Sequence, residues 1–455
     1  METEIPLPDG GAFALFERIR ALPWAVLLHS GTAADERGRW DILSAAPRRV
    51  LVLGRSVPES DVECFADGDA LLLRARTLLA TMQRSARPVI PDQEPTFRWG
   101  MLGYLGYEAR HAAFGLQRTD AADGLPAAAL GEYRWSVRVD RLTNRAWFSA
   151  VDDDPASRAM LARLTLGPGA HGGRNPTHGT TELPNWTEPD PGDYARGFSA
   201  VQDYLRAGDC YQVNLARRFQ LPWQGDAWAL FSALDAALPA AFGAFIASPF
   251  GTVLCCSPER LLHVRDGRAV SQPIKGTARR SADISEDHKV AEELQNSIKD
   301  RAENLMITDL TRNDLGQVAM PGSVSVPALF AVRTLPTVHH LESTVTARLA
   351  EGQDAISALQ SCFPAGSITG APKRRAMQII ADLEPAARSV YCGSIGYIDA
   401  RGNCDFNVAI RTLTIERGML NCWGGGGIVA DSTLAEDLRE IDAKVDALRA
   451  AATRR

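Results

Sequence analysis

The chain has 455 residues, of which 45% are hydrophobic and 23% are charged, a composition typical of a water-soluble globular protein. This length is enough for two or three domains or for one large two-part enzyme. Its 49 basic and 55 acidic side chains leave a net charge of −6, which argues against a general nucleic-acid-binding protein, because such a protein needs a basic face. A small site can still be locally positive and bind an anionic substrate.

The sequence carries no signal for a membrane or for secretion. No apolar run approaches the roughly 18 residues of a membrane span, and the acidic N-terminus lacks the basic start and apolar core of a signal peptide. The eight cysteines are scattered and include no Cys-x-x-Cys pair, so we expect reduced thiols rather than disulfides or a zinc site. These features predict a cytoplasmic protein without a membrane or nucleic-acid partner.

The N-terminal part alternates short apolar runs with turns. Periodicity and turn residues predict these elements in chain order: a buried strand over 24–28, a strand beginning at 41, a helix over 70–85, a glycine-rich and aromatic sheet segment over 97–108, and a hairpin over 133–152. Gly, Pro, His, Asn and Thr then dominate residues 166–190, where periodicity is absent. We therefore expect an N-terminal region over 1–165, a linker over 166–190 and a C-terminal region over 191–455.

The C-terminal region opens with a predicted helix over 191–207 and a strand over 209–215. Another helix is expected from about 285 to 310. Its apolar stripe is expected to contain Val290, Leu294, Ile298, Ala302 and Leu305. At 3.6 residues per turn, Asp300 and Glu303 lie roughly 60° apart on the side away from that stripe. Such charges most often form a solvated face.

The last helix is predicted to begin with a capping box formed by Thr433 and Glu436. Its apolar stripe is expected to contain Leu434, Leu438, Ile441, Val445 and Leu448. Asp437, Glu440 and Lys444 then share an adjacent face. Two helices that each offer a pair of acids can bring four carboxylates together, which is too much negative charge to bury without a cation. Ligands that are all oxygen favour Mg²⁺.

Residues 271–280, Ser-Gln-Pro-Ile-Lys-Gly-Thr-Ala-Arg-Arg, are interpreted as a strand end that runs into a tight loop. Pro273 fixes one backbone angle and Gly276 permits another, and Lys275 lies between them. If this lysine is desolvated, its pKa falls and the neutral amine becomes a base or a nucleophile. The residues alone leave open the alternative of an ordinary loop lysine.

Five motifs in order carry a resemblance to a known family. They are Pro-Ile-Lys-Gly-Thr at 273–277, Lys-Asp-Arg-Ala-Glu-Asn-Leu-Met at 299–306, Gly-Ser-Ile-Thr-Gly-Ala-Pro-Lys at 366–373, Gly-Ser-Ile-Gly-Tyr at 393–397, and Gly-Gly-Gly-Gly-Ile-Val-Ala-Asp-Ser at 424–432. In this order and spacing they resemble the chorismate-utilising enzymes. Leu-Pro-Trp at 22–24 and Leu-Leu-His-Ser-Gly at 27–31 extend the resemblance into the N-terminal half. The resemblance implies one large α+β architecture, in which antiparallel sheets pack face to face as a sandwich, helices lie outside and the site lies in a cleft between the sheets.

The resemblance also implies a reaction. A lysine at position 275 is typical of the aminodeoxychorismate synthase branch, whereas anthranilate synthases typically have alanine there. The resemblance implies that, in the aminodeoxychorismate synthase branch, the lysine attacks C2 of chorismate as the C4 hydroxyl leaves. Ammonia then attacks C4 and gives 4-amino-4-deoxychorismate, the precursor of p-aminobenzoate in folate synthesis. Glu259 matches the family's general acid, which needs a carboxyl with a raised pKa. A salt bridge to Arg260 is its alternative role.

The ligand sets are likewise implied by the resemblance. Glu303 and Glu440 are expected to bind Mg²⁺ directly, and Asp300 and Asp437 are expected to bind it through water. The expected substrate contacts are Gly276, Thr277, His340, Thr369, Tyr397, Arg411, Gly425, Gly426, Gly427 and Lys444. A tryptophan pocket, which regulates some relatives, is expected to contain Ser30, Tyr211 and Asn214. His340 could instead be a satisfied core histidine, and the two pocket residues on the 209–215 strand could instead satisfy buried backbone groups.

The sequence contains no glutaminase nucleophile motif and no lyase domain. Ammonia is therefore expected from a separate glutaminase subunit, and another protein would release pyruvate. The alternatives are an anthranilate synthase component I, an isochorismate or salicylate synthase in which Lys275 activates water, and a non-enzymic regulator that binds tryptophan or chorismate. Glu342 departs from the family pattern, because relatives have an apolar residue there. Its role stays open at this stage.

Overall fold

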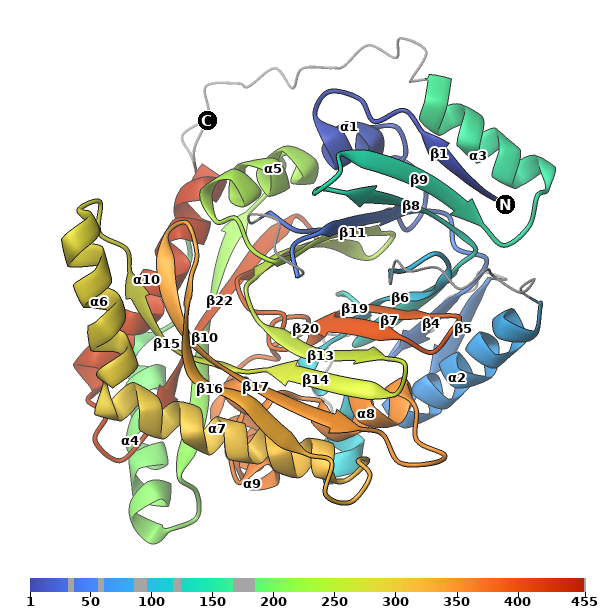
Figure 1. The fold of residues 1–455 in the computed structure, drawn as a ribbon. Coiled ribbons are helices and arrows are strands. Elements are labelled where there is room, and N and C mark those ends of the chain that lie inside the picture. Colours follow the sequence, from blue (N-terminus) through green and yellow to red (C-terminus); the bar gives the residue numbers. More distant parts are fainter. Residues whose placement is uncertain (32–36, 56–60, 86–95, 118–123, 167–184, 454–455) are drawn as a thin grey trace.

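The computed structural model describes residues 1–31, 37–55, 61–85, 96–117, 124–166 and 185–453. In these ranges the chain forms two large sheets that face each other, with helices on the outside (Figure 1). The predicted α+β sandwich is therefore confirmed. No helix within the described ranges is long and apolar enough to cross a bilayer.

The first sheet is antiparallel throughout. In spatial order its strands are β1 (Glu2–Ile5), β9 (Arg145–Ala150), β8 (Trp135–Asp140), β3 (Trp40–Ser44), β2 (Val26–His29), β11 (Phe242–Ser248), β12 (Gly251–Ser257), β21 (Thr412–Glu416), β22 (Met419–Ile428), β10 (Gln212–Pro222) and β18 (Gly370–Ala371). The hairpin predicted over 133–152 is the β8–β9 pair. The strands predicted near 24–28 and 41 are β2 and β3.

The second sheet is antiparallel except for the β4–β5 pair, which is parallel. In spatial order its strands are β15 (Ile274–Arg279), β17 (Val338–Arg348), β14 (Arg268–Gln272), β13 (Arg260–Arg265), β20 (Cys404–Asn407), β19 (Ser394–Asp399), β6 (Gly100–Leu105), β7 (Ala128–Tyr133), β4 (Val50–Leu53) and β5 (Val62–Phe65), and β16 (Ser325–Thr334) also pairs with β17. Both sheets combine strands from before residue 166 with strands from after residue 190. The expected linker, 166–190, lies mostly outside the described residues.

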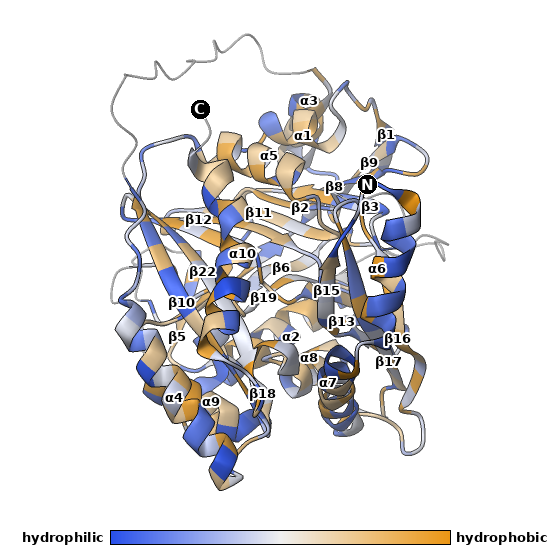
Figure 2. Ribbon diagram, turned by 90° about the vertical axis from the view of Figure 1, so that its left-hand side faces the viewer, coloured by the Kyte–Doolittle hydropathy of each residue, from blue (hydrophilic) through white to orange (hydrophobic). Residues whose placement is uncertain are grey.

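Helices cover the outer faces of both sheets. They are α1 (Gly11–Glu17), α2 (Gly68–Ser85), α3 (Pro155–Leu166), α4 (Pro191–Ala207), α5 (Ala227–Ala237), α6 (Ile284–Asn296), α7 (Ile298–Gly316), α8 (Ala355–Cys362), α9 (Lys373–Leu383) and α10 (Leu434–Thr453), with 3₁₀ turns η1 (Tyr107–Phe114) and η2 (Gly366–Ile368). Figure 1 shows α1 and α5 over the first sheet, and α2 and α8 against the second. On α4 and α10, hydrophilic and hydrophobic stretches alternate, as in amphipathic helices (Figure 2).

The interior between the sheets is apolar away from the site. One core cluster joins residues of the first sheet, such as Val26 and Val253, to residues of the second, such as Val52 and Leu102. A larger cluster packs the helices against the outer faces. The two sheets are therefore held together by burial of apolar surface, which stabilises the fold by about 25 cal/mol per Å².

Local signals placed several elements correctly. The helix α4 covers Pro191–Ala207, as predicted, and the side chain of Asp190 caps it by accepting from the N–H of Gly192 at 2.8 Å. The capping box of α10 is also confirmed, because the N–H of Glu436 donates to Thr433 Oγ1 at 3.4 Å and the two side chains share a 2.7 Å hydrogen bond. The apolar stripe of α10 faces inward at Ile441.

The prediction of one continuous helix over 285–310 is wrong, because the chain forms two helices, α6 and α7, that meet at Ser297. Ser297 has an extended backbone (φ −60°, ψ 114°), and its hydroxyl caps the new helix by accepting from the N–H of Asp300 at 3.2 Å. A cap residue outside the helix changes the direction in which the following side chains point. The predicted stripe therefore does not continue across the break.

The face of α7 that was expected to be buried is exposed. Ile298 is 87% exposed and Leu305 is 52% exposed, whereas Asn304 and Thr311 are buried against the second sheet. The inner face of this helix is thus mixed, because Ile307 and Leu315 are buried together with polar residues. This orientation turns Glu303, one position before Asn304, toward β15, which is the strand that carries Lys275.

Candidate active site

Lys275 lies on the strand β15 at the end of the second sheet, not in the tight loop that the sequence suggested. The strand is irregular, because its register against β17 shifts between Ile274 and Thr277. Gly276 lies inside this bulge with φ +91°, and a Cβ there would come 3.0 Å from the side chain of Asp300 on α7. The bulge thus brings the lysine strand close to α7.

The amine of Lys275 is surrounded by charges of both signs. The residue is half-buried, and desolvation lowers its pKa below the usual lysine value. The carboxylates of Glu303, Glu259 and Glu440 oppose this shift, whereas Lys444 adds to it. Lys444 is itself held by a 2.7 Å hydrogen bond to Glu440. A lowered pKa makes the amine neutral at a lower pH than in an ordinary lysine, and the neutral form is the one that attacks carbon.

Glu259 follows β12 and is 3% exposed. Its pKa is raised to about 7, chiefly by burial and to a smaller extent by the charge of Glu342. Ser367, the ammonium of Lys275 and the N–H of Ile274, at 3.4 Å, act in the opposite direction. A carboxyl that is still protonated near pH 7 is suited to general-acid catalysis, as the sequence predicted for this residue.

Two pairs of carboxylates approach Lys275 from opposite sides. Asp300 and Glu303 come from α7, and Asp437 and Glu440 come from α10. Burial raises the pKa values of Glu303 and Asp437, and Glu440 raises both further. The hydroxyl of Tyr194 donates to Asp437. Within the described ranges, no three acidic, histidine or cysteine side chains lie close enough to hold a metal ion.

The glycine-rich end of β22 forms the wall opposite Lys275. A Cβ on Gly427 would lie 3.5 Å from Lys275 Nζ and 2.6 Å from Gln212 Nε2. A Cβ on Gly426 would lie 2.1 Å from a carboxylate oxygen of Asp437. Real Cβ atoms do not come as close as 2.6 or 2.1 Å, so glycine allows the strand to approach Gln212 and Asp437. The site thus lies where the first sheet, through β22, meets the second, through β15.

Other predicted substrate contacts lie beside this wall. Thr277 Oγ1 and His340 Nδ1 are 2.8 Å apart, and desolvation together with the charge of Arg411 lowers the pKa of His340 to about 3, so this ring is neutral. The guanidinium of Arg411 makes no ion pair with the described part of the chain and is half-buried. Thr369 is fully buried, and its hydroxyl donates to the carbonyl of Ala365 at 2.8 Å. Arg411 is therefore a cation suited to a substrate carboxylate.

The family follows from comparison with known proteins. A family model described as chorismate binding enzyme matches residues 55–450. The chain belongs to the chorismate-binding enzymes. It is 43% identical over 446 residues to aminodeoxychorismate synthase component 1 of Klebsiella aerogenes, and the match covers 96% of each chain.

Solved structures of other family members share the fold. Anthranilate synthase component I from Streptococcus pneumoniae TIGR4 matches with a TM-score of 0.73 and 24% identity, over 90% of this chain and 92% of that chain. The menaquinone-specific isochorismate synthase from Escherichia coli matches with a TM-score of 0.74 and 20% identity, over 99% of this chain and 94% of that chain. At these identities the likeness concerns the fold.

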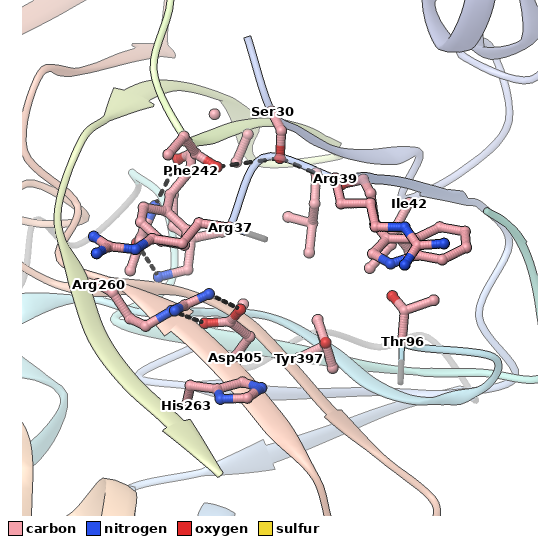
Figure 3. A pocket seen from close by; sticks show the side chains of 18 of the residues that line it. Ser30, Arg37, Arg39, Ile42, Thr96, Phe242, Arg260, His263, Tyr397 and Asp405 are labelled. Carbon is pink, nitrogen blue, oxygen red and sulfur yellow. Dashed lines mark hydrogen bonds and ion pairs between the residues drawn. The ribbon is translucent and has the colours of Figure 1, made fainter. Parts of the chain in front are cut away.

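A second cavity of this chorismate-binding enzyme lies between the two sheets, apart from Lys275. It has a volume of about 960 Å³ and is lined by Ser30, Arg37, Arg260 and Tyr397, among others (Figure 3). Tyr397 lines this cavity, and its contact with the substrate stays a prediction. Tyr397 lies on β19, and its ring packs 5.3 Å from that of Phe97 in this cavity.

The three residues expected to form a tryptophan pocket are not brought together. Ser30 lines the inter-sheet cavity, where its hydroxyl donates to the carbonyl of Ala241 at 3.2 Å. Tyr211 is 70% exposed and lies outside this cavity. Asn214 is buried beside Gly425, whose Cβ would lie 3.0 Å from Asn214 Oδ1. The strand β10 therefore faces the Lys275 site rather than the cavity that contains Ser30.

Sequence reasoning missed two residues of the enzyme's site. Gln212 is fully buried beside Gly427, and neither end of its amide has a hydrogen-bond partner in the described ranges. The hydroxyl of Tyr391 would lie 3.2 Å from a Cβ on Gly425, so Tyr391 reaches the glycine wall. The signal for Gln212 was its position two residues before Asn214 on the same strand, since alternate side chains share a face.

Proposed function

We propose that this enzyme makes 4-amino-4-deoxychorismate from chorismate and ammonia, as the synthase subunit of an aminodeoxychorismate synthase that supplies p-aminobenzoate for folate synthesis. The observation that carries this proposal is the half-buried amine of Lys275 among the carboxylates of Glu259, Glu303 and Glu440. By the resemblance, a lysine here accompanies either amination at C4 or activation of water, whereas alanine accompanies amination at C2. The name of the Klebsiella aerogenes relative, 43% identical along nearly the whole chain, supports the same reaction.

The reaction would proceed in two displacement steps. The neutral amine of Lys275 attacks C2 of chorismate, both conjugated ring double bonds shift, and the C4 hydroxyl leaves as water after it takes a proton from Glu259. The Lys275 nitrogen returns a proton to Glu259. Ammonia then attacks C4, both double bonds shift back, and the C2–nitrogen bond breaks to release lysine as it regains a proton. Water is the net leaving group.

Substrate binding needs donors for two carboxylates. Arg411 offers a planar pair of N–H groups that no described acid uses, and Gly425, Gly426 and Gly427 offer backbone N–H groups that no side chain shields. Lys444, which is fixed to Glu440, adds a second cation. The amide oxygen of Gln212 would accept a hydrogen bond from ammonia, because the buried amide lies beside Gly427 near Lys275 and has no described partner.

The four acids fit Mg²⁺ in type and charge. Asp300, Glu303, Asp437 and Glu440 offer only oxygen atoms, and burial raises the pKa values of Glu303 and Asp437, as happens where like charges await a cation. We propose that Glu303 and Glu440 hold the ion directly and that the two aspartates hold it through water. When bound, Mg²⁺ would neutralise these carboxylates and a carboxylate of the substrate.

We further propose that ammonia comes from a separate glutaminase subunit, as the phrase component 1 in the relative's name suggests. Tryptophan is proposed as a ligand of the inter-sheet cavity at Ser30, without the participation of Tyr211 and Asn214. Both proposals are independent of the chemistry at Lys275, because the isolated chain should use free ammonium.

Product analysis tests the proposed function. The purified chain is incubated with chorismate, Mg²⁺ and ammonium, and products are separated by chromatography and identified by mass. We expect 4-amino-4-deoxychorismate, which becomes p-aminobenzoate only after a lyase is added. Anthranilate, isochorismate or salicylate as the main product would overturn the proposal, and unchanged chorismate would favour a binding role. Lys275→Ala is the matched control and should lose amination at C4.

A further inference from the structure

Glu342 is a buried acid beside the catalytic strand. It lies on β17, is 4% exposed, and faces Ile274 across the β15–β17 ladder. Its carboxylate accepts two hydrogen bonds from the guanidinium of Arg37, at 2.6 and 2.8 Å. Arg333 adds a second cation at 3.8 Å. A buried carboxylate is costly unless it is paired in this way, so Glu342 and Arg37 form one unit.

Arg37 reaches Glu342 from a distant part of the chain. It follows β2 in sequence and lines the inter-sheet cavity, where Figure 3 shows it above Arg260 and Asp405. Gln272 connects the same groups, because its amide nitrogen is 3.4 Å from Glu342 and its oxygen accepts from Arg260 at 3.0 Å. The wall of the cavity and the strand β17 are thus joined by one polar network.

The network ends at the general acid. Ile274 faces Glu342 across the ladder and donates its N–H to Glu259, so the two carboxyl groups flank one residue of β15. The negative charge of Glu342 contributes to the raised pKa of Glu259, which is about 7 chiefly because of burial. The charge that Glu259 experiences therefore depends on whether Arg37 remains paired with Glu342.

We propose that the Arg37–Glu342 ion pair is a positioning pair for the reaction. Arg37 holds the carboxylate of Glu342 in place next to Glu259 and balances the negative charge of Glu342. The inference rests on the proposed role of Glu259 as general acid. Neither residue touches the reacting atoms.

Other charges also face Glu259, and the test leaves them unchanged. Lys275 approaches from β15. Asp314 on α7 lines a small cavity with Glu259 and is paired with Lys373 at 2.6 Å. Arg260 follows Glu259 directly and is held by Asp405 through two hydrogen bonds of 2.9 Å. Variants at positions 37 and 342 therefore change one known charge at a time.

Opposite substitutions should move the pH profile in opposite directions. The rate falls as pH rises through the pKa of Glu259, because the acid must be protonated. Glu342→Gln removes a negative charge and leaves Arg37 as a neighbouring cation, which moves this alkaline limb to lower pH by about 0.5–1 pH unit. Arg37→Met leaves Glu342 with only the more distant Arg333 as a described ion-pair partner, and moves the limb to higher pH by a similar amount. The double variant should return close to the wild-type profile.

The experiment measures kcat and kcat/KM for amination of chorismate by ammonium between pH 5.5 and 9. Glu132→Gln is the matched control, since Glu132 is also a buried glutamate paired with an arginine, Arg49 at 3.0 Å, but on the distant strand β7. It should leave the limb in place. Arg37→Lys keeps the cation and should also leave the limb in place. If Arg37→Met does not fold, Arg37→Gln replaces it, because it also removes the charge.

The outcomes separate the two proposals. Opposite shifts at positions 37 and 342, with cancellation in the double variant, support the positioning pair. The positioning pair is overturned if Glu342→Gln still aminates C4 but its alkaline pH limb does not move. It is also overturned if the single variants lower kcat without moving this limb. Failure of the wild-type chain to aminate C4 contradicts the proposed function instead.

Discussion

The protonation of Glu259 predicts a measurable effect on stability. The pKa of this buried carboxyl rises from the ordinary 4.5 to about 7 in the folded chain, and burial is the largest cause. Each pH unit of difference is worth about 1.4 kcal/mol, so ionising Glu259 in the folded state costs about 3 kcal/mol. Because the folded pKa is the higher one, the stability from the neutral acid is complete below pH 4.5 and is lost as pH rises through 7.

Glu259→Gln removes this dependence while it keeps the shape of the side chain. Relative to the wild type, the variant should gain about 3 kcal/mol in the free energy of unfolding between pH 5 and pH 8.5. Urea unfolding followed by fluorescence at both pH values gives the two differences. The same variant should lose amination at C4, because no proton reaches the departing hydroxyl.

A buried glutamate without a catalytic role provides the control. Burial also raises the pKa of Glu108 to about 7, although its carboxylate accepts backbone hydrogen bonds from Arg388 and Ser389. Glu108→Gln should show a similar pH-dependent gain in stability but keep the alkaline limb of the reaction. If the stability difference between Glu259→Gln and the wild type is the same at pH 5 and pH 8.5, the acid is not held neutral and the reasoning is refuted.

Three further variants test other parts of the site. Gly427→Ala should lower kcat about 100-fold, because its Cβ enters the space beside Lys275. In Gly424→Ala the Cβ meets α10 instead, so this variant should lose stability with a smaller effect on kcat. Equal losses of kcat in the two variants would contradict this reasoning. Lys373→Met should lower the free energy of unfolding by about 3–5 kcal/mol in urea titrations, because it leaves the buried carboxylate of Asp314 unpaired. A change under about 1 kcal/mol would show that Asp314 is neutral. Glu440→Gln should raise the Mg²⁺ concentration for half-maximal rate at least about 10-fold, and an unchanged Mg²⁺ titration would exclude it as a ligand.

The parts of the fold that were predicted correctly depend on local signals. The helix α4 begins with Asp190 and a proline and ends at a glycine, and each of these acts on its nearest neighbours. The same holds for Thr433 and Glu436 at the start of α10. The motif around Lys275 also sufficed to identify the central residue of the site. These features need no knowledge of distant contacts.

The errors concern contacts between distant segments. Ile298 and Leu305 looked like core residues, yet they are exposed because Ser297 restarts the helix and another face of α7 packs on the second sheet. Tyr391 and Tyr397 are both buried near one motif, but the local sequence does not show that Tyr391 lies beside Gly425 while Tyr397 lines the inter-sheet cavity. Glu342 stayed unexplained because its partner lies 305 residues away in sequence.

The most direct test of the central claim is to look for chorismate attached to Lys275. The chain is mixed with chorismate and Mg²⁺ without ammonium, quenched in acid, digested and analysed by mass spectrometry. The account predicts that the peptide with Lys275 gains the mass of chorismate less one water, and that adding ammonium before the quench removes this adduct. An unmodified Lys275 peptide, together with amination at C4 that persists in Lys275→Ala, would contradict it.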